Sequence, residues 1–201
     1  MFSLLAKEKG TAGVTIATSA DLFDCMRLVK TFERCFARSE NTRLVGGAAE
    51  PFYQPSGDDR PHNLLYFRED YFASALHETA HWCIAGRERR KLADFGYWYA
   101  PEGRNKSEQR AFEAVETKPQ ALEWIFSLAC GYRFQVSVDN FSDADEPVNS
   151  AGFELAVSAQ ARDWQTAGLP GRAAKFFDAL SEEFGTGARL EDLDFETGTS
   201  R

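Results

Sequence analysis

The chain has 201 residues, of which 43% are hydrophobic and 13% aromatic, so it is long enough for one domain with a sizeable core. Its formal net charge of -8 argues against direct nucleic-acid binding, because no basic surface is available to displace the counterions of a phosphate backbone. No secretory signal pattern and no apolar run long enough to span a bilayer occur, which predicts a cytoplasmic protein without membrane contact. The four cysteines form no CxxC pair and are expected to be buried thiols.

We divide the chain into a weakly ordered lead-in (residues 1–17), one folded domain (residues 18–185) and a mobile acidic tail (residues 186–201). A capping-box pattern at residues 18–21 opens the first predicted helix. Apolar residues at helical spacing predict the core face of this helix: Leu22, Met26, Val29, Phe32 and Phe36. After a short strand at Leu44 and Val45, the glycines and prolines up to residue 62 indicate a loop.

A buried strand and the helix after it form the next pair of predicted elements. The strand is the apolar run from Leu64 to Phe67, and Asp70 is placed to cap the helix that follows. Helical spacing then predicts a buried face formed by Phe72, Ala75, Leu76, Ala80 and Ile84. We therefore expect a helix that packs against a sheet.

This helix contains the most informative string in the chain, His77-Glu78-Thr79-Ala80-His81, which has the form HExxH. Side chains four residues apart lie on one helical face, so the two imidazoles can bind the same metal ion. The alternative is a pair of core histidines that are hydrogen-bonded to neighbours. Because the chain has only three histidines and the context is a helix on a sheet, the pattern favours a metal site.

A basic run and an aromatic strand follow the helix. Cations near a helix C-terminus offset its negative end, so Arg87 to Lys91 need no partner, although they could also contact an acidic protein. In the strand, alternate residues face opposite sides, so Tyr97, Trp98 or Tyr99 could form a wall beside the metal.

The next predicted helix runs from Ser107 to about Cys130, and Pro119 should kink or divide it. Its buried side is predicted to consist of Phe112, Val115, Pro119, Leu122, Ile125 and Phe126. Glu113 and Glu116 share a face, and Glu116 adjoins the apolar stripe, where a carboxylate needs a cation or a metal. A strand at residues 136–138 and helices at residues 150–167 and 172–184 complete the prediction.

Two histidines need a third protein ligand to hold a metal, and Glu116 is our first choice, ahead of Glu113 and then His62. A site of two histidines and one carboxylate describes hydrolytic zinc centres and also non-haem Fe(II) oxygenases, so the ligand types leave the reaction open. In a hydrolase Glu78 would be the general base that acts on a zinc-bound water. In an oxygenase it could instead orient a ligand.

Several longer strings carry a resemblance to a known family. HETAHWCIAG, RRKLADFGYWYAPEGR and FEAVETKPQALEW, together with the upstream NTRLVGG and EPFY, occur in order between about Phe32 and Leu180. In these strings the chain resembles the bacterial elongation factor P hydroxylase family. The resemblance implies an iron-dependent hydroxylase that acts on the lysine of elongation factor P after a β-lysyl group has been attached to it. It also implies a metal site of His77, His81 and a glutamate of FEAVE, for which we choose Glu116.

We therefore predict a single α+β domain in which a mixed sheet supports the HExxH helix, with Fe(II) bound between this helix and the FEAVE helix. The alternative is an HExxH zinc hydrolase or peptidase, and zinc can occupy the purified protein in either case because it generally outcompetes Fe(II) at such ligands. The modified lysine is cationic, so Asp94 and Glu102 are candidates to hold its ammonium groups.

Overall fold

The structure is a computed structural model, and it describes residues 22–96, 106–137 and 150–197. Within these ranges the chain is α+β, with five α-helices and a three-stranded mixed sheet. The helices are α2 (Cys25–Phe36), α3 (Phe72–Ile84), α4 (Lys106–Cys130), α5 (Ser150–Ala167) and α6 (Gly171–Phe184). Short 3-10 helices are η1 (Arg89–Lys91), η2 (Ala93–Gly96) and η3 (Leu190–Asp192). No helix in the described ranges is long and apolar enough to cross a membrane.

The sheet has the order β1-β3-β2, with β1 (Thr42–Ala48) parallel and β2 (Phe52–Gln54) antiparallel to the central strand β3 (Asn63–Arg68). Leu65 and Phe67 of β3 are buried, as the apolar run predicts. The strand β2 lies in a segment predicted to be loop. It is too short to show a strand period, and it is held at the sheet edge by Asp94, whose carboxylate accepts a hydrogen bond from the Tyr53 backbone N–H (2.7 Å).

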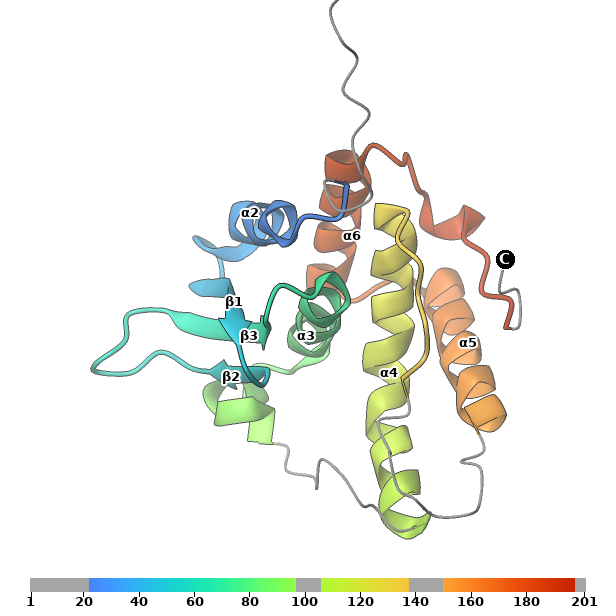
Figure 1. Cartoon of the computed structure of the whole chain (residues 1–201), viewed down its shortest axis with the longest axis horizontal. Coiled ribbons are helices and arrows are strands. Elements are labelled where there is room, and N and C mark those ends of the chain that lie inside the picture. The colour runs from blue at the N-terminus through green and yellow to red at the C-terminus, as the bar shows by residue number, and fades with distance from the viewer. Residues whose placement is uncertain (1–21, 97–105, 138–149, 198–201) are drawn as a thin grey trace, which may run out of the picture.

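The helix α3 lies between the sheet and α4 (Figure 1) and contacts β3 on one side and α4 on the other. Small and apolar residues at helical spacing, among them Ala75, Leu76 and Ala80, are fully buried and allow this close packing. Tyr71 occupies the N-cap position and no side chain caps the helix, so the expected capping by Asp70 is wrong. The α3 helix therefore depends on tertiary contacts on both sides.

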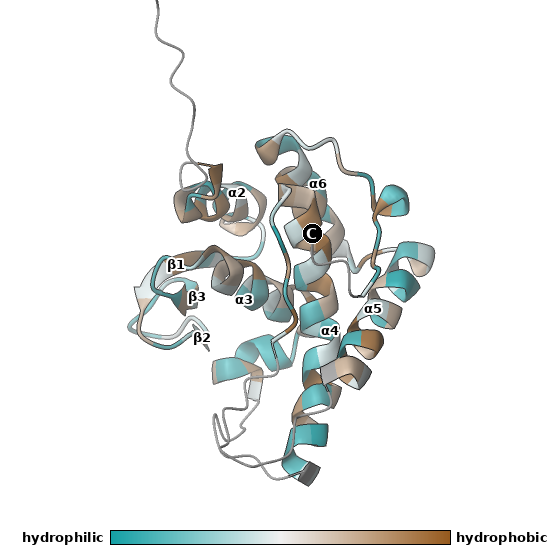
Figure 2. Ribbon diagram, turned by 45° about the vertical axis from the view of Figure 1, so that its right-hand side comes forward, coloured by the Kyte–Doolittle hydropathy of each residue, from teal (hydrophilic) through white to brown (hydrophobic). Residues whose placement is uncertain are grey.

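The long helix α4 is the centre of the helical layer, because it contacts α3, α5 and α6. It continues through Pro119 as one helix, so the predicted division at this proline does not occur. Burial on both sides of the proline explains why the lost hydrogen bond is tolerated: Glu116, Gln120, Ala121 and Leu122 are all buried. Figure 2 shows hydrophobic and hydrophilic residues alternating around these helices, as expected for helices with one buried side.

The helix α2 begins later and is rotated relative to the sequence prediction. The Asp24 side chain caps it by accepting a hydrogen bond from the Met26 N–H (2.9 Å). Leu22 and Met26 are exposed, whereas Phe32 and Phe36 are buried as predicted. The buried face is completed by Cys25, Leu28, Thr31 and Cys35, which the apolar spacing did not select.

The end of the described chain differs from the loose packing expected after residue 185. Phe195 is only 1% exposed, and its carbonyl accepts hydrogen bonds from Ser158 Oγ (2.7 Å) and Arg162 Nη2 (3.1 Å) on α5. Residues 136–137 form no strand. The four cysteines are free and buried, as predicted. The lead-in (residues 1–17), the capping box at 18–21, the aromatic residues 97–99, Glu102 and Val138 lie outside the described residues.

Candidate metal centre

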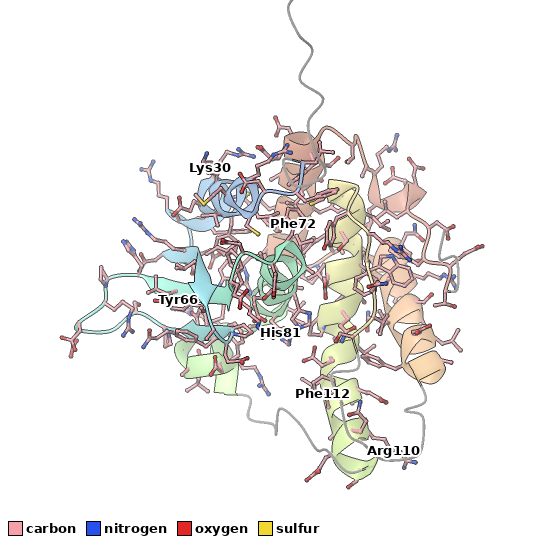
Figure 3. The ribbon with its side chains drawn as sticks, in the orientation of Figure 1. Lys30, Tyr66, Phe72, His81, Arg110 and Phe112 are labelled. Carbon is pink, nitrogen blue, oxygen red and sulfur yellow. The ribbon has the colours of Figure 1, made fainter. Side chains whose placement is uncertain are left out.

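Two neighbouring helices bring three of the predicted ligands together. The imidazoles of His77 and His81 share one face of α3, and Glu116 reaches them from α4. The two Nε2 atoms lie 3.1 Å apart, His77 Nε2 is 3.4 Å from Glu116 Oε2, and His81 Nε2 is 3.3 Å from Glu116 Oε1. Figure 3 labels His81 on α3 and Phe112, one turn before Glu116, on α4. One ligand atom from each residue can therefore bind the same ion, since all lie within 4.8 Å of one another.

His81 and Glu116 are buried, Glu116 most of all at 2% exposed, whereas His77 is half-buried. Burial alone raises the pKa of Glu116, but the charge of His81 and the hydrogen bonds with both histidines outweigh it, so the pKa falls below its usual range. Burial likewise lowers the pKa of His77, yet hydrogen bonds with Glu116 and Glu123 raise it well above 6.5. The two shifts have one cause, because the carboxylate of Glu116 and positive charge on the histidines stabilise each other. The ionised carboxylate of Glu116 therefore favours a cation beside it.

The residues fit a divalent transition metal. Glu116 Oε1 is buried and lies 3.3 Å from His81 Nε2 without a hydrogen bond of good geometry, and a buried carboxylate oxygen in this position is costly. The two Nε2 atoms face each other at a distance where at most one proton can lie between them. A cation bound by both nitrogens and the carboxylate would satisfy all three groups. Zn²⁺ and Fe(II) both accept this set of two imidazoles and one carboxylate.

The other two candidates for the third ligand lie outside this group. The carboxylate of Glu113 accepts a hydrogen bond from Gln109 Nε2 (3.1 Å) on its own helix. His62 is in the loop before β3, where its Nδ1 lies 2.7 Å from Asn41 Oδ1. Among the described residues, the structure therefore groups Glu116 with the two histidines.

Glu78 is half-buried on α3 beside His77. Burial has the largest effect on the pKa of the Glu78 carboxyl and raises it. The negative charges of Glu116 and Glu123 also raise this pKa, whereas His77 and His81 lower it. The Glu78 carboxyl therefore lies close enough to the ligands of the candidate metal centre to interact with their charges. Its role in catalysis remains a prediction.

Sequence reasoning missed one residue of the centre, Glu123. Its Oε2 lies 2.8 Å from Nδ1 of His77, and the residue is only 8% exposed. Glu123 follows Glu116 by seven residues, which is about two helical turns, so both carboxylates share one face of α4. This spacing was the signal that could have identified it.

The residues proposed to contact the substrate or a partner have structural contacts. Asp94 holds the edge strand β2, as described above. In the basic run, Arg90 Nη1 is paired with Glu40 (2.7 Å), and Lys91 is paired with Glu88 (2.7 Å). Contact of this run with an acidic protein stays a prediction.

Two comparisons with known proteins agree with each other. The model of a family described as elongation factor P hydroxylase matches residues 31–195. The chain is also 47% identical over 159 residues to a Haemophilus influenzae protein named elongation factor P lysine hydroxylase. This alignment covers 79% of the chain and 88% of that protein.

Proposed function

This chain belongs to the elongation factor P hydroxylase family, and on that basis we propose that it hydroxylates a lysine of elongation factor P. We propose further that the substrate is the lysine side chain that already carries a β-lysyl group. The reaction would use a non-haem iron centre held by His77, His81 and Glu116. The observation that carries the proposal is the convergence of these three ligands in a chain that matches the family over most of its length.

Fe(II), when bound, would supply the oxygen-activating chemistry by which one atom of O2 enters a C–H bond, while the other leaves as water with two electrons from an external reductant. The protein supplies position and shielding. Two ligands come from one face of α3, and the third comes from α4, which is packed against α3. His81 and Glu116 are buried, which keeps water away from the reacting centre and limits side reactions.

The alternative is a zinc hydrolase, and one observation favours keeping it. Glu78 sits next to His77 in the HExxH string, and burial raises its pKa toward the range that suits a general base. Replacement of Glu78 by Gln separates the two reactions. A hydrolase would lose peptide cleavage, whereas retained metal together with retained oxygen transfer would exclude the hydrolase.

The direct test is the intact mass of β-lysylated elongation factor P after incubation with the protein, Fe(II), a reductant and air. We expect a gain of one oxygen atom that is absent without air and absent with His77→Ala. An unchanged mass, with iron shown to be bound and a reductant supplied, would contradict the proposal. Peptide-cleavage assays with zinc would then decide whether the hydrolase is correct.

A further inference from the structure

We propose that Glu123 is a positioning residue for the metal centre, which orients His77 and fixes the tautomer in which Nε2 is free to bind metal. The inference rests on the metal centre of the proposed function and concerns a residue that is not one of its three ligands. Its basis is the short contact between Glu123 Oε2 and His77 Nδ1 (2.8 Å).

The two nitrogens of His77 face different partners. Nδ1 points to Glu123, while Nε2 lies 3.1 Å from His81 Nε2 and 3.4 Å from Glu116 Oε2. A neutral imidazole has one N–H and one lone pair, and a carboxylate can only accept a hydrogen bond. The proton of the neutral ring therefore belongs on Nδ1. Consequently the lone pair of Nε2 points at the position where the metal would bind.

The turn of α4 that contains Glu123 is held in place from three directions. The neighbouring Trp124 stacks on Phe134 (5.1 Å between ring centroids) and meets Phe195 edge-on (5.4 Å). Gln120 exchanges two hydrogen bonds with the Ser137 backbone, donating to its carbonyl (2.6 Å) and accepting from its N–H (3.0 Å). The backbone at Glu123 is therefore held by contacts that do not involve the three candidate ligands, and a supported backbone is what orienting a ligand requires.

A buried carboxylate also needs this partner. The Glu123 side chain is 11% exposed, and leaving it without a hydrogen bond would cost free energy. Contact with the carboxylate increases the electron density on the imidazole and makes it a stronger ligand. Residues that orient a ligand in this way typically change metal affinity by about 10- to 100-fold when they are removed.

The test is titration of the metal-free protein with Co(II), a spectroscopic probe for sites of this kind, in the wild type, Glu123→Gln and Glu123→Ala. We expect Co(II) to bind about 10-fold more weakly in the Gln variant and about 100-fold more weakly in the Ala variant. We also expect a shifted Co(II) absorption spectrum, because His77 is no longer held in one orientation. The Gln variant preserves the shape of the side chain and keeps the test valid if the Ala variant does not fold.

Glu113→Gln is the matched control, because Glu113 is on the same helix and bonds to Gln109 instead. It should bind Co(II) as the wild type does, and an equal loss in this control would overturn the inference. Unchanged affinity and spectrum in both Glu123 variants, with normal binding by the wild type, would overturn the role of Glu123 and leave the proposed function intact. If the wild type itself binds no Co(II), the metal centre of the proposed function fails as well.

Discussion

Glu116 is a buried carboxylate whose nearest polar partners are the two histidines, His77 at 3.4 Å and His81 at 3.3 Å. It is 2% exposed, and one of its oxygens accepts no hydrogen bond. We predict that Glu116→Ala abolishes stable metal binding, since two histidines alone leave the ion without its carboxylate ligand. Glu113→Ala should retain the metal. The metal content of both variants after dialysis, measured by mass spectrometry, checks the prediction, and a loss confined to the Glu113 variant would transfer the ligand role to that residue.

Gly46 is a second residue whose identity the structure explains. A Cβ atom at this position would lie 2.7 Å from Cζ of Phe67 and 3.1 Å from the Glu69 carbonyl oxygen. Phe67 is buried and cannot move away easily. We predict that Gly46→Ala lowers the free energy of unfolding by about 1–3 kcal/mol, the usual cost of overpacking.

Urea denaturation checks this value, with Gly57→Ala as the control. A Cβ at Gly57 would have no atom within 4 Å, so this variant should be close to the wild type in stability. Equal stability of the two variants would mean that β1 shifts to make room beside Phe67.

The helices illustrate how far local sequence pattern determines an element. The boundaries predicted for α4, α5 and α6 agree with the structure within one residue, because apolar spacing and turn residues mark them in the sequence. The strand β2 was missed because its three residues are held by a side chain from η2, Asp94, and by pairing with β3. Long-range contacts of this kind leave no local pattern.

In the candidate site, too, some residues could be predicted from a local pattern, whereas others depend on contacts between elements. His77 and His81 could be predicted because their spacing of four residues is fixed by the geometry of one helix. Glu116 could be ranked above Glu113 because it adjoins the apolar stripe of its helix, and the resemblance to a known family led to the same choice. Glu123 was missed although its spacing of seven residues places it on the same face of α4 as Glu116, and only the packing of α4 on α3 shows that it contacts His77.

At the scale of elements, the C-terminal end of α3 depends on α6. Arg172 Nη2 donates hydrogen bonds to the carbonyl oxygens of Trp82 (3.1 Å), Cys83 (3.0 Å) and Ala85 (2.6 Å), which would otherwise lack partners at the helix end. Its guanidinium also lies 4.9 Å from the centre of the Trp82 ring. We predict that Arg172→Ala lowers the free energy of unfolding by about 2–3 kcal/mol.

Thermal unfolding followed by circular dichroism measures this loss, with replacement of the exposed Arg38 by Ala as the control. The control should change little, because surface substitutions away from such contacts usually do. If Arg172→Ala unfolds at the temperature of the control, water replaces the guanidinium at the helix end and the contact adds no stability.

At the scale of the whole molecule, the segment after α6 connects two helices of the helical layer, because it runs from the end of α6 across to α5 (Figure 1). Gln165 Nε2 on α5 donates hydrogen bonds to the carbonyls of Leu190 (2.9 Å) and Leu193 (2.8 Å), and Phe195 packs edge-on against Trp124 of α4. The residues after 185 therefore contribute to the core, although their acidic composition favoured a mobile tail. Local composition could not reveal this, because a single phenylalanine makes the decisive contact.

We predict that Phe195→Ala lowers the free energy of unfolding by about 3–5 kcal/mol, the usual cost of emptying a buried phenylalanine site. It should also weaken metal binding, because Trp124 loses its edge contact and directly follows Glu123. Urea denaturation and Co(II) titration of the same variant measure the two effects. Removal of residues 197–201 is the control and should change neither, since it leaves Phe195 in place. A destabilised Phe195→Ala variant that binds Co(II) normally would show that the segment stabilises the fold without fixing the position of Glu123. In that case the hydrogen bonds between Gln120 and Ser137 would be sufficient to hold this turn of α4.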